Sequence, residues 1–135
     1  MRAEGTFTVK SFVPATVEVP IEVTTAAPAG VATMEKAFEG EIAGRAATLF
    51  TAAYDQARGT GTYLAMEAFE GSVAGRSGTF NFAHSATTTG TDASNRFFVI
   101  VPGSGTGELA GITGDGGIRI DEDGTHRIWF EYQIG

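Results

Sequence analysis

The chain has 135 residues, of which 42% are hydrophobic and 19% are charged, a composition that is typical of one folded domain. It has no cysteine, which excludes disulfides, thiolate metal sites and cysteine nucleophiles, and 16 acidic against 9 basic residues give a net charge of -7, which argues against nucleic acid as a partner. No apolar run approaches the roughly 20 residues of a membrane helix, and no signal peptide is recognisable. We therefore expect a soluble, cytoplasmic, single-domain protein over residues 1–135.

The distribution of glycine and threonine predicts an all-β chain. The 19 glycines separate stretches that are rich in threonine, valine and phenylalanine, which favour strands, and no long helical pattern interrupts them. The predicted strands span residues 4–12, 31–42, 45–55, 61–73, 77–90, 94–102, 115–121 and 125–134. Residues 13–30 hold three of the four prolines and are interpreted as an edge segment or a long surface loop, either a lid or a mere connection. Residues 106–111 can form no more than one helical turn.

An internal repeat predicts how the strands are joined. The segment Phe38–Thr48 returns 31 residues later as Phe69–Thr79, with the shared pattern F-E-G-x-[IV]-A-G-R-x-x-T. Each copy is interpreted as a strand, a tight Ala-Gly turn and a second strand, so the copies form neighbouring hairpins. A meander of about eight such strands hides its edges by closing into an up-and-down barrel, whose interior can hold one small ligand.

The repeat also places opposite charges at equivalent positions. Lys36 stands two residues before Phe38, and Glu67 stands two residues before Phe69. Because side chains alternate along a strand, both charges face the lumen if both phenylalanines do, and they can then pair across it. The alternative is an exterior face on which both charges are solvated. Tyr63 shares the phase of Glu67 and would stand on the same wall, where it can orient a bound oxygen.

The two histidines of the chain both fall in apolar phases. His84 alternates with Phe80 and Phe82, and His126 alternates with Phe130 along the last strand. An inward imidazole suits a general acid or base at neutral pH. The alternative for each is a core histidine that is hydrogen-bonded to a backbone group or a tyrosine.

The sequence predicts no cofactor and no metal site. A metal needs three or more converging ligands, and His84, His126 and Glu67 come from distant strands with no spacing signature. The acidic run 121–124 lacks the calcium-loop pattern and is interpreted as a hairpin turn. The glycine-rich run 103–107 lacks the third glycine of a dinucleotide loop and the Gly-Lys-Ser/Thr of a triphosphate loop, which leaves a structural turn.

Three further segments carry a resemblance to a known family. They are Gly5–Ser11, Gly75–Phe80 and Val101–Gly111. Together they resemble the bacterial family described as domain of unknown function 3224. The resemblance implies a closed barrel similar to that of plant allene oxide cyclase, whose G-x-G-x-x-x-G segment is echoed by Gly105, Gly107 and Gly111. It does not imply that cyclase's reaction, because one fold serves many chemistries.

An enclosed, mostly apolar lumen with a few polar groups predicts that the protein binds a small molecule. The enzyme hypothesis is a cofactor-independent isomerase or cyclase, in which Glu67, His84 or Tyr63 moves a proton or stabilises developing charge on a mostly apolar substrate such as a biosynthetic intermediate. The expected ligand contacts are Lys36, Phe38, Phe69, Phe80, Phe82, Phe130 and Tyr132. The alternatives are a non-catalytic carrier or sensor, and a structural oligomer with a barrel filled by side chains.

The strand predicted over residues 94–102 is apolar on both sides. Phe97 and Val99 alternate with Phe98 and Ile100, and Trp129 stands opposite the apolar phase of the last strand. The outer side of a barrel can be covered only by the proline-rich segment or by another subunit. The pattern therefore favours a homo-oligomer, with a dimer as the expected form.

Overall fold

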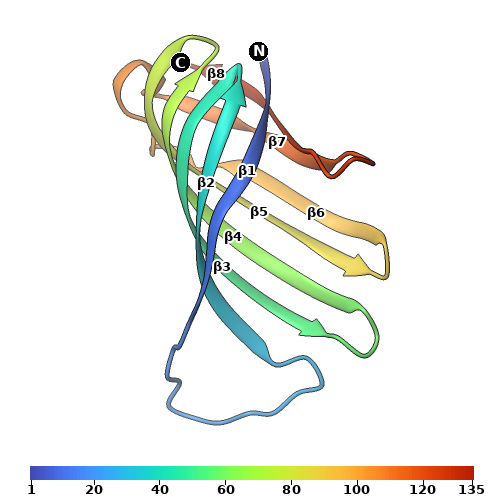
Figure 1. The fold of residues 1–135 in the computed structure, drawn as a ribbon. Coiled ribbons are helices and arrows are strands. Elements are labelled where there is room, and N and C mark those ends of the chain that lie inside the picture. Colours follow the sequence, from blue (N-terminus) through green and yellow to red (C-terminus); the bar gives the residue numbers. More distant parts are fainter.

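The structure, a computed structural model that describes residues 1–135, contains eight antiparallel strands in one sheet (Figure 1). The strands are β1 (Arg2–Ala15), β2 (Ala29–Gly40), β3 (Ile42–Asp55), β4 (Thr60–Val73), β5 (Arg76–Thr89), β6 (Asp92–Ile100), β7 (Ile112–Ile120) and β8 (His126–Ile134). Each strand pairs with its neighbours in the sequence, and β8 pairs with β1, so the sheet closes in a ring. Closure satisfies the hydrogen-bonding groups of both edge strands.

The predicted all-β, up-and-down fold is confirmed, with a strand at each of the eight predicted places. The one helical element is η1 (Gly107–Leu109), a single 3-10 turn inside the predicted segment 106–111. No helix is long and apolar enough to cross a membrane. The two termini lie at the same end of the barrel (Figure 1), where the Met1 amino group donates to the carbonyl oxygen of Tyr132 at 2.8 Å.

The second copy of the repeat turns where the sequence predicts, but the first copy does not. Ala74 and Gly75 have φ angles of 49° and 84°, the positive values that a type I′ hairpin turn requires between β4 and β5. The equivalent Ala43 and Gly44 lie inside β3, because the chain already reverses after Gly40, which has a φ of 106°. The predicted Ala-Gly turn is therefore wrong for the first copy. Gly44 instead allows close strand contact, since a Cβ there would lie 2.2 Å from a carbonyl oxygen of β4.

Side chains fill one end of the barrel. A cluster of 15 buried hydrophobic residues occupies it. Its phenylalanines, with neighbouring ring centroids 5.2–6.1 Å apart, are Phe7, Phe38, Phe69, Phe80, Phe82 and Phe130. The segment between β6 and β7 folds against this end and contributes the fully buried Leu109 to the cluster. Its glycine-rich run is the structural turn that the sequence predicts: a Cβ on Gly105 would lie 2.0 Å from the carbonyl oxygen of Leu109.

The barrel has its fewest paired residues between β6 and β7. Only one residue pair, Ile100 with Gly114, joins these two strands, whereas β7 and β8 pair along nine residues each. Figure 1 shows β6 and β7 separating from each other away from this pair. The separation leaves the lumen accessible from the end opposite the chain termini.

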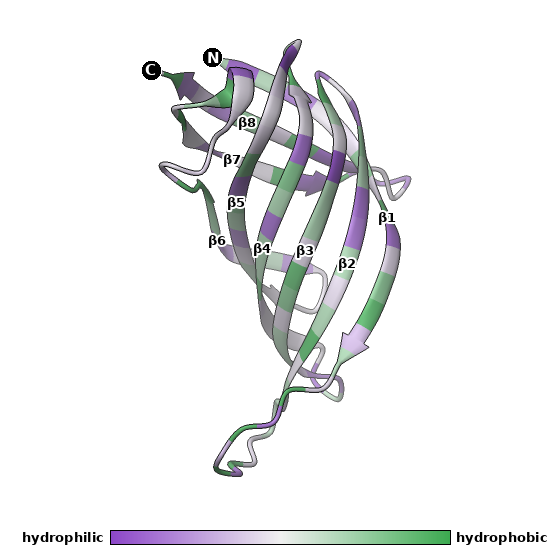
Figure 2. Ribbon diagram, turned by 90° about the vertical axis from the view of Figure 1, so that its left-hand side faces the viewer, coloured by the Kyte–Doolittle hydropathy of each residue, from purple (hydrophilic) through white to green (hydrophobic).

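Two apolar features remain exposed on the outside. The first, which we call the exterior patch, consists of Leu49, Leu64, Met66 and Phe97, all at least 43% exposed. The second is the loop between β1 and β2, where Val17, Val19, Ile21 and Val23 are exposed. Figures 1 and 2 show this loop extending beyond the barrel, so it is a connection that does not cover the lumen in this structure. The prediction that the strand over residues 94–102 is apolar on both sides is confirmed by exposed Phe97 and buried Ile100.

Candidate functional site

Glu67 is the centre of a buried polar network inside the barrel. Its fully buried carboxylate accepts hydrogen bonds from Lys36 Nζ at 2.5 Å and His84 Nε2 at 2.7 Å. The hydroxyl of Thr48 donates to its other oxygen. These donors come from β2, β5 and β3, so the network ties four neighbouring strands together. The predicted pairing of Lys36 with Glu67 across the lumen is confirmed, and the alternative of two solvated exterior charges is wrong.

His84 extends the network toward Tyr63. The Tyr63 hydroxyl lies 2.8 Å from His84 Nδ1, on the opposite side of the ring from the Glu67 contact. An ionised carboxylate can only accept, so Nε2 donates to Glu67, and in the tautomer with its proton on Nε2 the Nδ1 atom has a lone pair. Nδ1 then accepts the hydrogen bond from the phenol. The result is a continuous chain of hydrogen bonds from Tyr63 through His84 to Glu67.

Aromatic rings hold this chain in place. The His84 ring stacks on Phe82 and Phe98, with centroids 5.9 Å and 5.8 Å away, and the Tyr63 ring stacks on Phe50 at 5.6 Å. Packing on these faces restricts ring rotation, which keeps the hydrogen-bonding atoms aligned. Network and aromatic support therefore form one preorganised unit.

Burial and charge act in opposite directions on the two acidic groups. Burial alone would raise the pKa of Glu67, but the hydrogen bond from His84 and the charge and hydrogen bond of Lys36, helped by Thr48, outweigh it and hold that pKa below its ordinary value. Glu67 is thus ionised at neutral pH. Burial raises the pKa of Tyr63, and the nearby Glu67 charge raises it further. Tyr63 is therefore a neutral phenol at neutral pH.

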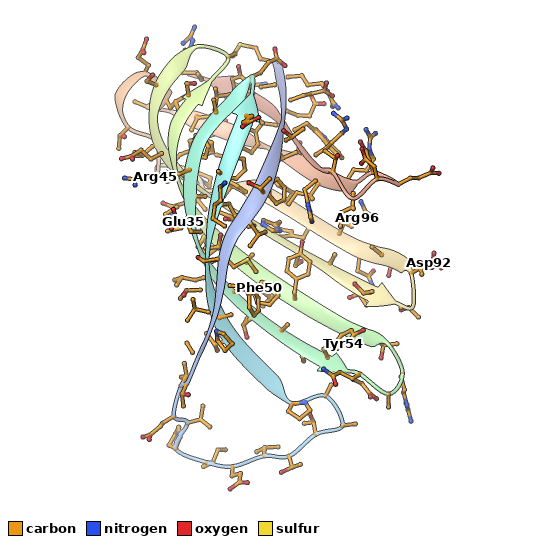
Figure 3. The ribbon with its side chains drawn as sticks, in the orientation of Figure 1. Glu35, Arg45, Phe50, Tyr54, Asp92 and Arg96 are labelled. Carbon is orange, nitrogen blue, oxygen red and sulfur yellow. The ribbon has the colours of Figure 1, made fainter.

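A cavity of about 430 Å³ lies directly against this network. Tyr63 and His84 line it on one side, and residues from β6, β7 and β8, among them Phe98, Ile118 and Trp129, line the rest. Its lining is mixed, with 8 hydrophobic residues of 16. The volume and the mixture of apolar walls with a few polar groups suit a small organic molecule. Figure 3 shows Phe50 inside the barrel and Arg96 near the diverging strands β6 and β7.

The site residues predicted from the sequence lie in different parts of the barrel. Tyr63 and His84 line the cavity, whereas Glu67 and Lys36 are buried beside it. The predicted ligand-contacting aromatics, which belong to the packed core and do not line the cavity, are Phe38, Phe69, Phe80, Phe82, Phe130 and Tyr132. They face inward as expected, but at the filled end of the barrel. His126 packs on the ring of Phe7 at 5.1 Å and has no hydrogen bond to the network.

No group of three or more histidine, cysteine or acidic side chains is placed to hold a metal ion. The three residues weighed for such a site are divided between two places, because His84 contacts Glu67 whereas His126 packs on Phe7. The acidic run after β7 makes a turn, in which Gly124 N–H donates to the carbonyl oxygen of Asp121 at 2.9 Å.

Sequence reasoning missed Thr48, Arg96 and Phe98. Thr48 is the last residue of the repeat motif and stands between Ala46 and Phe50 in the apolar phase of its strand, so its inward position could have been found. Arg96 shares the phase of Phe98, which would have placed both on the lumen side. Neither signal reports how far along the barrel a side chain lies, because that depends on strand register, which the sequence does not specify.

Comparisons with known proteins agree with the fold. The family model described as "Protein of unknown function (DUF3224)" matches residues 3–132. A crystal structure of a protein with unknown function from the DUF3224 family of Shewanella oneidensis is similar at 27% identity and a TM-score of 0.85, over 100% of this chain and 97% of that one. A comparison with the curated proteins finds no match. The likeness to allene oxide cyclase stays a prediction. Because the family model spans nearly the whole barrel, the chain belongs to the DUF3224 family.

Proposed function

We propose that the protein binds a small, mostly apolar molecule at the open end of the lumen and acts on it as a cofactor-independent isomerase or cyclase. The observation that carries the proposal is the hydrogen-bond chain from Glu67 through His84 to Tyr63, which ends on the 430 Å³ cavity. A structural network alone does not need its last hydroxyl to line a cavity. A proton-transfer group does, because it must reach the reacting atom.

The chain of residues supports a reversible proton shift. Tyr63 donates its proton to His84 Nδ1, so the lone pairs of its oxygen are available to a ligand. When the phenolic oxygen takes a proton from the ligand, the Tyr63 proton moves to Nδ1, and the new imidazolium is stabilised by the Glu67 carboxylate at 2.7 Å. Return of the proton to another atom of the ligand gives an isomer. In the cyclase form of this reaction, the apolar walls first fold the ligand so that a ring can close.

The runner-up is a non-catalytic carrier or sensor of the same kind of ligand. Every buried side-chain nitrogen and oxygen already has a partner within the protein, so the network can serve stability alone. The filled end of the barrel would also suit a structural oligomer. These alternatives predict that changes in the network alter affinity or stability but no reaction rate.

Mass spectrometry on protein purified without ligand removal tests the proposal. We expect a small organic molecule in the native spectrum that leaves on denaturation. With that compound, Tyr63→Phe should bind with similar affinity and lose turnover about 100-fold or more, the usual size of a general acid–base contribution. Tyr54→Phe is the matched control, because Tyr54 does not line the cavity. Unchanged turnover in Tyr63→Phe would contradict the catalytic role, and binding without any turnover would favour the carrier.

We further propose that the protein is a cytoplasmic homodimer, with the exterior patch covered by the same patch of a second copy. In support, Leu49, Leu64 and Met66 form a contiguous apolar surface across β3 and β4, because Leu49 pairs with Met66 and Leu64 lies two residues away. Exposed apolar surfaces of this kind mark protein interfaces. A two-fold dimer would bury the patch on itself.

A further inference from the structure

An arginine without an acidic partner lines the cavity. Of the nine lysines and arginines, six form salt bridges, and Lys10 and Arg76 lie on the outside. The ninth, Arg96, has no carboxylate partner and faces the cavity. Its one side-chain hydrogen bond runs from Nη1 to the carbonyl oxygen of Ile118 at 3.2 Å. A guanidinium has five N–H donors, so most of them are free for a ligand.

The backbone of β6 fixes where this arginine stands. Asn95 adopts a left-handed conformation with a φ of 50°, and Asn95 and Arg96 together lie opposite the single residue Ala86, because Ser85 pairs with Phe97 and Thr87 with Ser94. Such β-bulges often direct a side chain at functional sites. The hydrogen bond to Ile118 then spans the gap where β6 and β7 have no ladder (Figure 3).

The residues that line the cavity carry positive charge, although the protein as a whole is negatively charged. The chain as a whole carries a net charge of -7, yet the cavity lining holds two arginines and no acidic residue. The second, Arg119, is occupied by Asp121 at 3.2 Å. Arg96 is therefore the free cation of this cavity. A positive site that contrasts with the rest of the surface attracts and selects an anion.

From these observations we propose that the ligand is an amphipathic carboxylate: Arg96 binds the carboxylate group, and Phe98, Ile118 and Trp129 hold the apolar body against Tyr63. Arginine is suited to this task because its planar fork can bind both carboxylate oxygens at once. The inference deepens the proposed function and rests on it, since it uses the same cavity.

Two fluorescent probes with the same ring system test the inference. N-phenyl-1-naphthylamine is neutral, and 1-anilinonaphthalene-8-sulfonate adds one anionic group. We expect the anionic probe to bind more tightly than the neutral one, and Arg96→Gln to weaken the anionic probe roughly 10-fold or more, the size of one charge-assisted contact, with less than about a 2-fold change for the neutral probe. Arg96→Lys keeps the positive charge but not the planar guanidinium fork. Its affinity for the anionic probe should lie between those of the wild-type protein and Arg96→Gln.

Two control variants test whether the probes bind in the cavity and whether the loss of affinity is specific to Arg96. Arg76→Gln removes the same charge from β5 at the opposite end of the barrel and should leave both affinities unchanged. Ala86→Phe places a large side chain in the cavity lining and should abolish binding of both probes. Equal losses in Arg96→Gln and Arg76→Gln, or probe binding that survives in Ala86→Phe, would overturn the inference.

The two probes distinguish a cavity that binds no carboxylate from a protein that has no ligand-binding cavity. If the neutral probe binds in the cavity but the anionic probe gains nothing from Arg96, only the carboxylate inference is overturned. If neither probe binds to the wild-type protein, the small-molecule cavity itself is overturned and the carboxylate inference falls with it. Thermal melting of each variant shows that it is folded before it is titrated.

Discussion

Lys36 and Glu67 form a buried ion pair inside the barrel. Both side chains are at most 6% exposed, so neither charge is solvated by water. Removal of one partner leaves the other uncompensated. We predict that Lys36→Met lowers the free energy of unfolding by about 3 kcal/mol, and that Lys36→Met with Glu67→Gln costs less than the sum of the single changes. Urea denaturation measures both.

The exposed pair of Arg45 with Glu70 is the matched control. Its side chains are 73% and 62% exposed, and it joins β3 to β4 on the outside. Exposed ion pairs contribute between zero and about 1 kcal/mol. Arg45→Met should therefore change stability by less than that amount, and equal costs for Lys36→Met and Arg45→Met would refute the buried pair as a source of stability.

The lowered pKa of Glu67 predicts an acid-dependent loss of stability. The unfolded chain binds the proton more tightly than the folded one, because the ordinary pKa of 4.5 is lowered on folding. This contribution is fully present above pH 4.5 and is lost as the pH falls from there through the folded pKa. The melting temperature of wild-type protein should therefore fall more steeply than that of Glu67→Gln between about pH 5 and pH 3. Parallel curves would show that Glu67 contributes nothing to the acid response.

At the scale of elements, close strand contact at glycine predicts where side chains are not tolerated. A Cβ on Gly44 would lie 2.2 Å from the carbonyl oxygen of Glu70 and the residue has a φ of 144°, whereas a Cβ on Gly30 would meet nothing within 4 Å. We predict that Gly44→Ala lowers the unfolding free energy by more than about 2 kcal/mol and that Gly30→Ala changes it by less than about 1 kcal/mol. Chemical denaturation distinguishes them, and equal effects would contradict the described contact of β3 with β4.

The repeat explains how much of the site the sequence could predict. Equivalent positions in the two copies predicted that Lys36 and Glu67 face alike, and side-chain alternation put His84 and Tyr63 on the lumen side. Alternation gives the face of a strand but not the height along the barrel. For that reason the phenylalanines expected around a ligand proved to be the packed end.

The turn of the first copy could not be predicted from similarity. Ala43 and Gly44 have the same letters as Ala74 and Gly75, but Gly40 offers an earlier reversal, and the ladder between β3 and β4 then includes Gly44. Local sequence left both positions possible, and strand pairing selected one. The bulge that positions Arg96 likewise depends on pairing with β5 rather than on a local signal.

At the scale of the whole molecule, the exterior patch predicts self-association. Leu64 is 56% exposed at its centre, so Leu64→Asp should place a charge in the dimer interface and change little inside the barrel. We predict that light scattering gives twice the chain mass of 14.0 kDa for wild-type protein and the single chain mass for Leu64→Asp. Thr8→Asp, which adds the same charge at an exposed position on β1 outside the patch, should leave the mass unchanged. A monomeric wild-type protein at all concentrations would contradict the dimer.

The two ends of the barrel differ in how they are packed. The packed end, with its 15 clustered hydrophobic residues, supplies stability, whereas the end where β6 and β7 diverge keeps a cavity beside a polar network. Rigid support on one side of a cavity is the arrangement that holds functional groups in place. We therefore expect the cavity to bind a small molecule next to Tyr63 and His84.

Binding in the cavity can be measured by a two-dimensional NMR titration of isotope-labelled protein with N-phenyl-1-naphthylamine, because the spectrum reports every backbone amide at once. We predict saturable shifts that centre on Ser85, Phe98 and Gly116, which line the cavity on three strands. Amides of the packed end, such as those of Phe69 and Ile42, should stay in place. No saturable shift, or shifts confined to the exterior patch around Leu64, would contradict a ligand-binding lumen.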